Sequence, residues 1–448
     1  MISRILQGLS GDRLKARVAR STSWIILGYG ASQGLRLASN LILTRLLFPE
    51  AFGLMALITT VTVGLRLFSD VGLSPSIAQS KRGDDPDFLD TAWTIQVIRG
   101  FLLWLVASLL AYPAAQFYGE PDLAVYLPIA ALALCISGFN PSRIETANRH
   151  LLMGRLTALD LASQLIGIVS MVVLAWMLHS VSALVIGGLI GVVAKLLLTH
   201  FGLPGQTNRF RWETAAVGEL VRFGKWIFLS TAFWFFTSQG DKLVLGKFLT
   251  LENLGIYNIG FFLASFPVLL GSAVTQRVMI PIYRENARPE RIRRLRYVLS
   301  FGLVGLLVVM ALAGPWLVDL MYDARYAQAG SIVVILALAQ IILVMGTTYD
   351  QAALAAGDSL RVFLYSAARS GLQFAFLILG AVYGGLIGAL IGVAASIVLA
   401  HGVLIWLARV HGVWDPRHDL LFVCVAVAAT AGALWLHGDA IRTQLIGF

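Results

Sequence analysis

The stretch LILTRLLFPEAFGLM, residues 41–55, returns without a gap as LVLGKFLTLENLGIY, residues 243–257. The two copies lie 202 positions apart, and the Trp-Ile pair that begins at Trp24 recurs at Trp226 at the same shift. Leucines, a glutamate and a glycine keep their places, and Arg45 is matched by Lys247. Apolar identities arise easily by chance, but polar and glycine positions in register indicate an internal duplication.

The composition around this repeat is that of a membrane protein. Of 448 residues, 58% are hydrophobic and 13% are charged, whereas an average soluble domain is about 25% charged. Apolar runs of roughly 18–25 residues recur, each long enough to cross a bilayer. We expect an all-α polytopic protein with about 12–14 transmembrane helices, and we place spans at 22–44, 52–69, 90–115, 123–141, 156–178, 181–200, 223–246, 255–275, 298–318, 327–348, 361–382, 384–408 and 420–437.

The repeat predicts how these spans are grouped. An even number of spans separates the two copies, so both copies begin on the same side of the membrane and the duplication is parallel. We therefore expect two six-helix lobes related by a pseudo-two-fold axis along the membrane normal. The expected segments are a basic N-terminus (1–21), an N-lobe (22–200), an inter-lobe linker (201–222), a C-lobe (223–408) and an extra C-terminal helix with its tail (409–448).

The repeated loop has a structural interpretation. Arg45 and Lys247 are expected near helix C-termini, where the helix dipole favours a cation. Glu50 and Glu252 are expected at the start of the following helices, where the dipole favours an anion. The glycine that follows in each copy would permit a tight approach of another segment.

Lysine and arginine are distributed unevenly between the two sides. Of the 34 basic residues, 24 fall on the side of the N-terminus and only four on the other side. Cytoplasmic loops of membrane proteins carry this excess, so the N-terminus is expected to be cytoplasmic. The net charge of +10 then reflects topology, and nucleic acid is not an expected partner, because the basic residues are spread over many short loops.

Several classes of site have no signature in this sequence. There is no phosphate-binding P-loop, the seven histidines are scattered, and Cys135 and Cys424 both fall in apolar runs. No long loop carries an acid–base cluster of the kind that a membrane glycosyltransferase needs. We therefore expect no enzyme, no catalytic residue, no metal and no cofactor.

Three arginines are the strongest candidates for substrate contact. Arg36, Arg99 and Arg369 lie roughly eight or nine residues inside their spans, about 12–14 Å from the membrane surface. A charge at that depth costs about 2.5–3.5 kcal/mol or more, so it faces a hydrated cavity or an ionic partner. Guanidinium groups also bind pyrophosphate bidentately. Both readings, substrate contact and structural pairing, stay open.

Polar neighbours extend this candidate cavity. Gln33 and Asn40 share a helix face with Arg36, and Gln96 is one turn from Arg99. Hydrogen bonds between packed spans are the alternative role for such residues. Asp241 and Lys242 complete the set, and because adjacent helical residues diverge by about 100°, they cannot both face one spot.

The remaining intramembrane charges receive other interpretations. Asp241 is also a candidate ion-coupling site, although pairing with a deep arginine is the simpler reading. Arg66 and Lys195 lie near span ends, where they could reach the interface by snorkelling. Arg66 could also form a structural pair with Asp70, four residues further along one helix face.

Four segments carry a family resemblance: TRLLFPEAFGLMAL (44–57), FSDVGLSPSIAQS (68–80), TIQVIRGFLLW (94–104) and DKLVLGKFLTLENLGIYNIGFFLASFP (241–267). In this order they resemble the polysaccharide transporter family, the Wzx-type oligosaccharide flippases of the MOP superfamily. The resemblance covers nearly the whole chain.

The resemblance implies a function. It implies two lobes around a central cavity and alternating-access transport of undecaprenyl-pyrophosphate-linked oligosaccharide repeat units across the bacterial inner membrane, for O-antigen or exopolysaccharide biosynthesis. Membrane lipids are implied partners, and a polysaccharide polymerase and a chain-length regulator are open ones. The alternative is another MOP-type exporter, for lipid II or for drugs in exchange for cations. An excess of deep cations argues against cationic drugs.

Overall fold

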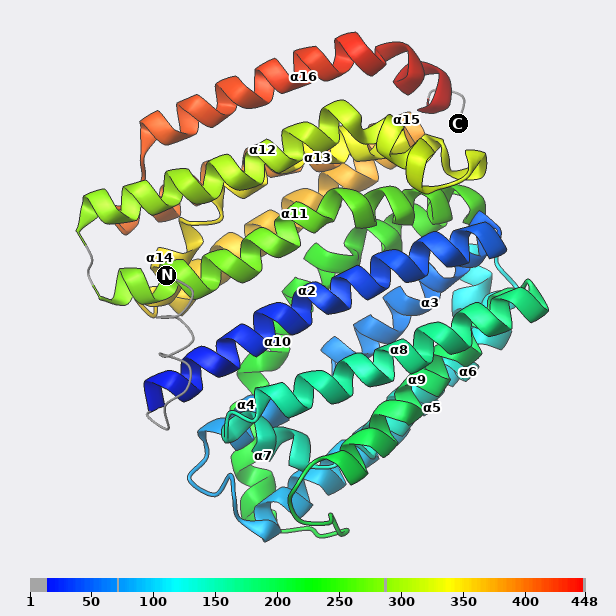
Figure 1. Ribbon diagram of the computed structural model, residues 1–448, viewed down its shortest axis with the longest axis vertical. Helices are drawn as coiled ribbons and strands as arrows, with labels where there is room; N and C mark the ends of the chain where they lie inside the picture. The colour runs from blue at the N-terminus through cyan, green and yellow to red at the C-terminus, as the bar shows by residue number, and fades with distance from the viewer. Residues whose placement is uncertain (1–13, 71, 286–287, 446–448) are drawn as a thin grey trace. The chain divides into compact units, whose positions relative to one another are not determined.

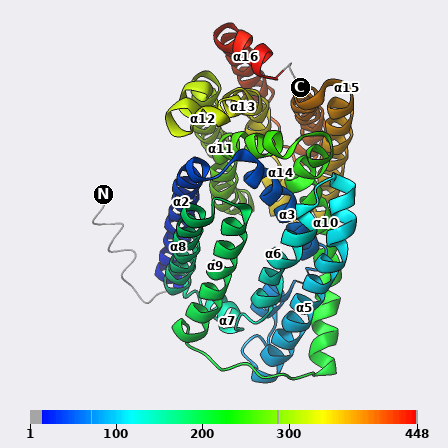
Figure 2. The same cartoon turned by 90° about the vertical axis from the view of Figure 1, so that its right-hand side faces the viewer.

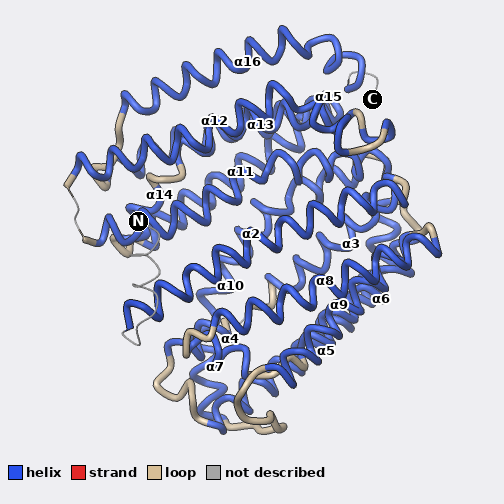
Figure 3. The backbone as a smooth tube through the Cα atoms, viewed as in Figure 1, coloured by secondary structure: helices blue, strands red, loops and turns tan. Residues whose placement is uncertain are grey.

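The computed structural model describes residues 14–70, 72–285 and 288–445, and these form helices joined by loops (Figure 3). The chain divides into two compact units. Unit 1 holds residues 1–47 and 57–232, and unit 2 holds residues 48–56 and 233–448. An all-helical fold is confirmed for the described residues.

The first repeat contains two short and six long helices (Figure 1). In chain order they are α2 (Leu14–Leu46), α3 (Pro49–Leu67), α4 (Leu73–Gln79), α5 (Pro86–Tyr118), α6 (Asp122–Gly138), α7 (Arg143–Arg149), α8 (Met153–Leu178) and α9 (Val181–Gly202).

The second repeat follows the same plan and adds one helix at its end. It comprises α10 (Thr214–Phe248), α11 (Leu251–Arg284), α12 (Pro289–Met321), the short 3-10 helix η1 (Ala324–Tyr326), α13 (Gln328–Gly346), α14 (Asp350–Ala355) and α15 (Ser359–Val410), and the added helix is α16 (Pro416–Leu445).

Helix boundaries confirm the duplication. α2 ends at Leu46 and α10 ends at Phe248, while α3 begins at Pro49 and α11 begins at Leu251. Both pairs are separated by the 202 positions found in the sequence. The short helices α7 and α14 also occupy equivalent places, each between the fourth and fifth long helices of its repeat. The charges in the repeated loop lie as expected: the basic residues in last turns, the glutamates in first turns.

The repeated glycines make a reciprocal backbone contact inside unit 2. A Cβ atom on Gly53 would lie 2.0 Å from the carbonyl oxygen of Leu251, and one on Gly255 would lie 2.0 Å from the carbonyl oxygen of Pro49. Pro49 and Leu251 are themselves counterparts in the repeat. The starts of α3 and α11 therefore cross so closely that only glycine fits, which confirms the predicted tight approach.

α15 folds back on itself and supplies two of the expected spans. Its 52 residues would extend about 78 Å as a straight helix, far more than a bilayer core of about 30 Å. The helix breaks at Gly384 and Gly385, and Gly385 has a φ of 56°, a backbone conformation that favours glycine. Gly380 and Gly388 then pack with their backbones in contact, so the spans expected at 361–382 and 384–408 form a hairpin.

Fewer helices than expected qualify individually as membrane spans. In the described part of the chain, nine helices are long and apolar enough to cross a membrane, or ten if the bent pair α6–α7 counts as one span. The expectation of about 12–14 is higher for two reasons. First, the hairpin α15 supplies two expected spans but counts as one candidate helix. Second, the expected spans 22–44 and 223–246 correspond to α2 and α10, which are too polar to count as candidate spans.

Unit 1 is built from neighbouring helix pairs. α8 packs on α9 and α2, while α5 packs on α6, which also contacts α9 (Figure 2).

The segment that leads to α10, residues 203–213, is shorter than the expected linker of 201–222, since α10 begins at Thr214. The C-terminal end of this segment is held in place by the Arg82 guanidinium, which pairs with Glu213 at 2.8 Å and with Asp85 at 2.6 Å. The same guanidinium holds the pKa of the Asp85 carboxyl below its ordinary value.

Unit 2 is organised around α13. This helix contacts α11, α12, α15 and α16, and it lies in the most buried of the candidate spans. α16 packs on α12 and α13 (Figure 1). The helix that lies outside the duplicated six-helix plan is therefore attached to the core of unit 2.

Candidate functional site

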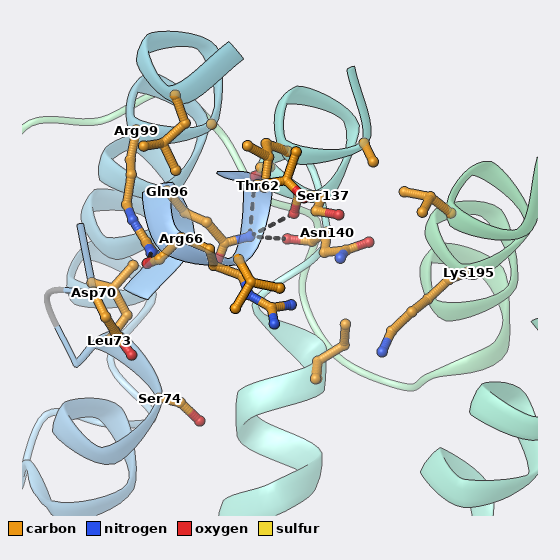
Figure 4. A pocket seen from close by; sticks show the side chains of 18 of the residues that line it. Thr62, Arg66, Asp70, Leu73, Ser74, Gln96, Arg99, Ser137, Asn140 and Lys195 are labelled. Atoms are coloured by element: carbon orange, nitrogen blue, oxygen red, sulfur yellow. Dashed lines mark hydrogen bonds between the residues drawn. The ribbon is translucent and has the colours of Figure 1, made fainter. Parts of the chain in front are cut away.

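A cavity of about 500 Å³, lined by polar and apolar residues, lies inside unit 1. Its walls come from α3, α5, α6 and α9 and from the short helices α4 and α7 with their adjoining loops. Figure 4 shows its labelled side chains, among them three cations from three different helices: Arg66 of α3, Arg99 of α5 and Lys195 of α9. Two acidic residues, Asp70 and Glu145, also line it.

Arg99 is half-buried and is held by the end of α3. Its Nε donates to the Ser69 hydroxyl at 3.0 Å, and one terminal nitrogen donates to the Arg66 carbonyl at 2.7 Å. Helix ends leave carbonyl groups without intrahelical partners, so a guanidinium is a natural partner there. Arg99 lines this cavity of unit 1 and also has a structural role, while its contact with substrate stays a prediction.

Arg66 differs from the sequence-based interpretation. In the described part of the chain, its guanidinium has no ion pair or side-chain hydrogen bond, and the expected pair with Asp70 is not formed. The reason is that α3 ends at Leu67, so the spacing of four residues no longer places Asp70 on the same helix face. The Asp70 carboxylate instead accepts the backbone N–H of Gly72 at 2.9 Å.

The two guanidinium groups of the cavity are electrostatically coupled. Asp70 attracts the Arg99 guanidinium, and Arg66 repels it to a smaller extent. Two cations close together inside a membrane helix bundle are unfavourable unless an anion joins them. The arrangement is therefore suited to bind an anionic group with several acceptor oxygens.

Lys195 was expected to snorkel, yet it lines the same cavity. Its ammonium group lies 2.9 Å from the Asp160 carboxylate of α8. Both side chains are about 40% exposed, so this pair contributes little to stability. Sequence reasoning missed Arg66 and Lys195 as cavity residues because it judged each charge by depth along its own helix.

Gln96 lines the cavity with its side chain engaged at the end of α6. Its amide nitrogen donates to the carbonyls of Gly138 at 3.0 Å and Asn140 at 3.2 Å (Figure 4). The sequence left two roles open for Gln96, one in a cavity and one in hydrogen bonding between helices. In the structure the residue lines the cavity of unit 1 and also bonds to the end of α6.

The polar residues of α2 are not among those that line this cavity. Gln33 is buried and donates to the Tyr29 hydroxyl at 3.0 Å, while Arg36 is exposed and Asn40 is partly buried. The neighbouring Ser32 exchanges hydrogen bonds with Gln164 of α8, which is the interhelical role considered for this stripe. Substrate contact by Gln33, Arg36 and Asn40 stays a prediction.

Asp241 and Lys242 point to different partners within unit 2. The Asp241 carboxylate is 2% exposed and accepts a hydrogen bond from the Tyr257 hydroxyl at 2.7 Å. The Lys242 ammonium lies 5.3 Å from the centre of the Phe261 ring, within the range of a cation–π contact. The two side chains diverge as their adjacent positions require, and the ion-coupling role of Asp241 stays a prediction.

Arg369 has a carboxylate nearby that sequence reasoning missed. On α15 it interacts with the Tyr365 hydroxyl one turn away and electrostatically with the partly buried Asp350. Asp350 begins α14, a short helix that follows the apolar span and has no period long enough to be recognised. The geometry is compatible with structural pairing for Arg369, one of the two roles left open.

Among the described residues, no group of three or more histidine, cysteine or acidic side chains is placed to hold a metal ion. The polar groups that line the cavity are cations, carboxylates, amides and hydroxyls. These groups can bind a polar anionic ligand, and the Ser74 hydroxyl donates to the Glu145 carboxylate at 2.5 Å within the cavity wall.

Proteins named for succinoglycan, lipopolysaccharide and teichuronic acid biosynthesis are similar in sequence to this chain. The chain is 22% identical over 379 residues to a succinoglycan biosynthesis transport protein, ExoT, of Rhizobium meliloti, covering 84% of this chain and 76% of that one. It is 20% identical over 385 residues to the lipopolysaccharide biosynthesis protein WzxC of Escherichia coli, covering 85% and 78%. The teichuronic acid biosynthesis protein TuaB of Bacillus subtilis is 22% identical over 307 residues, covering 66% and 62%.

Solved structures establish the fold. The structure of the lipid II flippase MurJ in an inward closed conformation is similar to this one, with a TM-score of 0.71 at 10% sequence identity, over 93% of this chain and 99% of that one. A multidrug resistance MATE family transporter of the MOP superfamily matches with a TM-score of 0.61 at 17% identity, over 89% and 96%. At these identities the likeness concerns the fold alone. The profile of the polysaccharide biosynthesis protein family matches residues 42–355, and this multi-pass membrane protein belongs to that family.

Proposed function

We propose that the chain is a flippase for undecaprenyl-pyrophosphate-linked oligosaccharide repeat units in the biosynthesis of a bacterial surface polysaccharide. The observation that carries the proposal is the cavity in unit 1, where Arg66, Arg99 and Lys195 of three helices line one space and Arg66 forms no ion pair among the described residues. A pyrophosphate supplies several negatively charged oxygens, and guanidinium groups bind such oxygens bidentately.

The relatives support this substrate class. ExoT is named as a transport protein of succinoglycan biosynthesis, and WzxC as a protein of lipopolysaccharide biosynthesis. A carrier that moves a lipid-linked sugar needs cations for the phosphates and polar groups for the sugar. The same cavity offers the side chains of Ser74, Ser137 and Asn140, which can form hydrogen bonds to hydroxyl groups.

We further propose the inner membrane as the location, with a cytoplasmic N-terminus, since the basic residues concentrate on that side. The cargo would then enter from the cytoplasmic leaflet and leave to the opposite one, by transport rather than by catalysis. A polymerase and a chain-length regulator acting on the delivered units are the protein partners that this role requires.

A deletion strain tests the proposal. Loss of the protein should trap lipid-linked repeat units in the cytoplasmic leaflet and abolish the surface polymer. The measurement is the accessibility of the lipid-linked sugar to a membrane-impermeant glycosidase in spheroplasts, with plasmid-borne wild-type protein as the control. Full polymer display by the deletion strain, in a background without a second flippase gene, contradicts the proposal.

A further inference from the structure

A buried polar cluster in unit 2 lies where α15 ends and α16 begins. The Asp419 carboxylate accepts hydrogen bonds from the Tyr349 hydroxyl at 2.7 Å and the Trp414 indole at 3.0 Å. The imidazoles of His401 and His418 lie 3.4 and 3.2 Å from the same carboxylate. Asp419 is 7% exposed and His418 is fully buried. A buried carboxylate is costly without partners, and here both of its oxygens have them.

His418 is placed so that it can exist with one proton or with two. Its Nδ1 faces Asp419, and its Nε2 lies 2.9 Å from the Ser300 hydroxyl of α12. A hydroxyl group can donate or accept. It can therefore donate to Nε2 of a neutral ring and accept from Nε2–H of an imidazolium, so the ring gains or loses a proton without losing a hydrogen bond.

The charged and titratable side chains around this cluster are Tyr283 of α11, Arg293, Arg296 and Tyr297 of α12, Tyr349 before α14, Arg409 of α15, and Asp415 before α16. α13 also packs on α16 but has no charged or titratable residue.

The surrounding cations have partners of their own. Arg293 pairs with Asp415 at 3.3 Å. Arg296 lies 4.5 Å from the centre of the Tyr349 ring and donates to the hydroxyls of Thr348 and Tyr283. Arg409 lies 4.0 Å from the Trp414 ring centre. Among the described ion pairs, the two imidazoles are the groups that share the Asp419 carboxylate.

We propose that His418, Asp419 and His401 form a proton-binding site in which His418 carries the proton. The proton adds to the lone pair of a His418 ring nitrogen and leaves again from the same nitrogen. No other bond forms or breaks. The hydrogen bond from Nδ1–H to the carboxylate is charge-assisted in either state of the ring, and a second proton on the ring adds ionic attraction between His418 and Asp419. Because the site joins α12, α15 and α16, the bound proton fastens α16 to the rest of unit 2. This inference is independent of the cargo.

The test uses the purified full-length protein in detergent micelles with ¹⁵N-labelled histidine. The chain has seven histidines, and the His418 and His401 signals are assigned by their loss in His418→Gln and His401→Gln. The ¹⁵N shifts show whether the His418 ring carries one proton or two as the pH is varied over a range on both sides of neutral, and we expect the two-proton form to occur in the wild-type protein. Asp419→Asn removes the facing carboxylate, so the second proton should be lost at a lower pH in that variant.

Asp358→Asn is the matched control, since Asp358 lies 3.3 Å from His411, also in unit 2. It should alter the His411 signal and leave His418 unchanged. A His418 ring that stays neutral throughout the range, or one that titrates identically without Asp419, overturns the proposal. If Asp419→Asn does not fold, Ser300→Ala takes its place, because it removes the partner of Nε2; an unchanged His418 titration in that variant also overturns it.

Discussion

Replacing Arg66 and Arg99 together with glutamine should abolish polymer export, with a loss of at least about 100-fold, while the protein still reaches the membrane. Each hydrogen bond from a guanidinium to a charged oxygen contributes about 1.5–3 kcal/mol, so the loss of two such partners accounts for a factor of this size. The measurement is surface polymer per molecule of membrane-inserted protein in a deletion strain.

The single variants separate substrate contact from structure. Arg66→Gln should lower export strongly and leave thermal stability near the wild-type value, because this guanidinium holds no other described side chain. Arg99→Gln should lower both, because Arg99 also binds the end of α3. The matched control is Arg211→Gln, which removes an exposed arginine of unit 1 paired with Asp87. Wild-type export by the Arg66→Gln, Arg99→Gln double variant contradicts the assignment of the cavity.

Valine at Gly53 or Gly255 should prevent the correct folding of unit 2. A Cβ atom at either position would lie 2.0 Å from a backbone carbonyl oxygen, and a backbone cannot give way as a flexible side chain can. Overpacking of this kind costs about 1–3 kcal/mol or more. We expect a markedly lower yield of monodisperse protein and a lower melting temperature, measured by thermal unfolding in detergent.

Gly302 and Gly305 of α12 provide the matched controls, since a Cβ atom on either would meet nothing within 4 Å. Alanine at these positions should be neutral or slightly stabilising. Because the contact is reciprocal, the Gly53→Val and Gly255→Val variants should have similar defects. Normal folding of either valine variant would show that the two helix starts do not cross at these glycines.

The fold could be predicted from sequence to a large extent, because the two copies of the duplicated segment form the same helices and the same loop. Arg45, Glu50 and Gly53 each had a local physical reason for their place, and the helix boundaries follow the same register. The short helices α7 and α14 could not be predicted, since seven or six residues carry too little period. Asp350, and with it the neighbour of Arg369, was missed for that reason.

The site could be predicted only in part, because cavities form between helices. Arg99 was proposed as a cavity residue from its depth along one span, and it lines the cavity of unit 1. Arg66 and Lys195 were judged by the same rule and assigned to the interface, although α3 and α9 bring them to the wall of the cavity that Arg99 lines. The Arg66–Asp70 pair assumed a helix that continues past Asp70, and α3 ends three residues earlier. Depth along one helix does not say which neighbouring helix a side chain faces.

Binding of the lipid-linked cargo to the purified protein tests the central claim most directly. The protein is mixed with undecaprenyl-pyrophosphate-linked oligosaccharide in detergent, and the bound lipid is measured by native mass spectrometry beside undecaprenol as the uncharged control. We expect the wild-type protein and the Arg211→Gln variant to retain the pyrophosphate lipid in preference to undecaprenol, and the Arg66→Gln, Arg99→Gln double variant to lose that preference. Equal retention of the pyrophosphate lipid by the folded double variant would contradict the account.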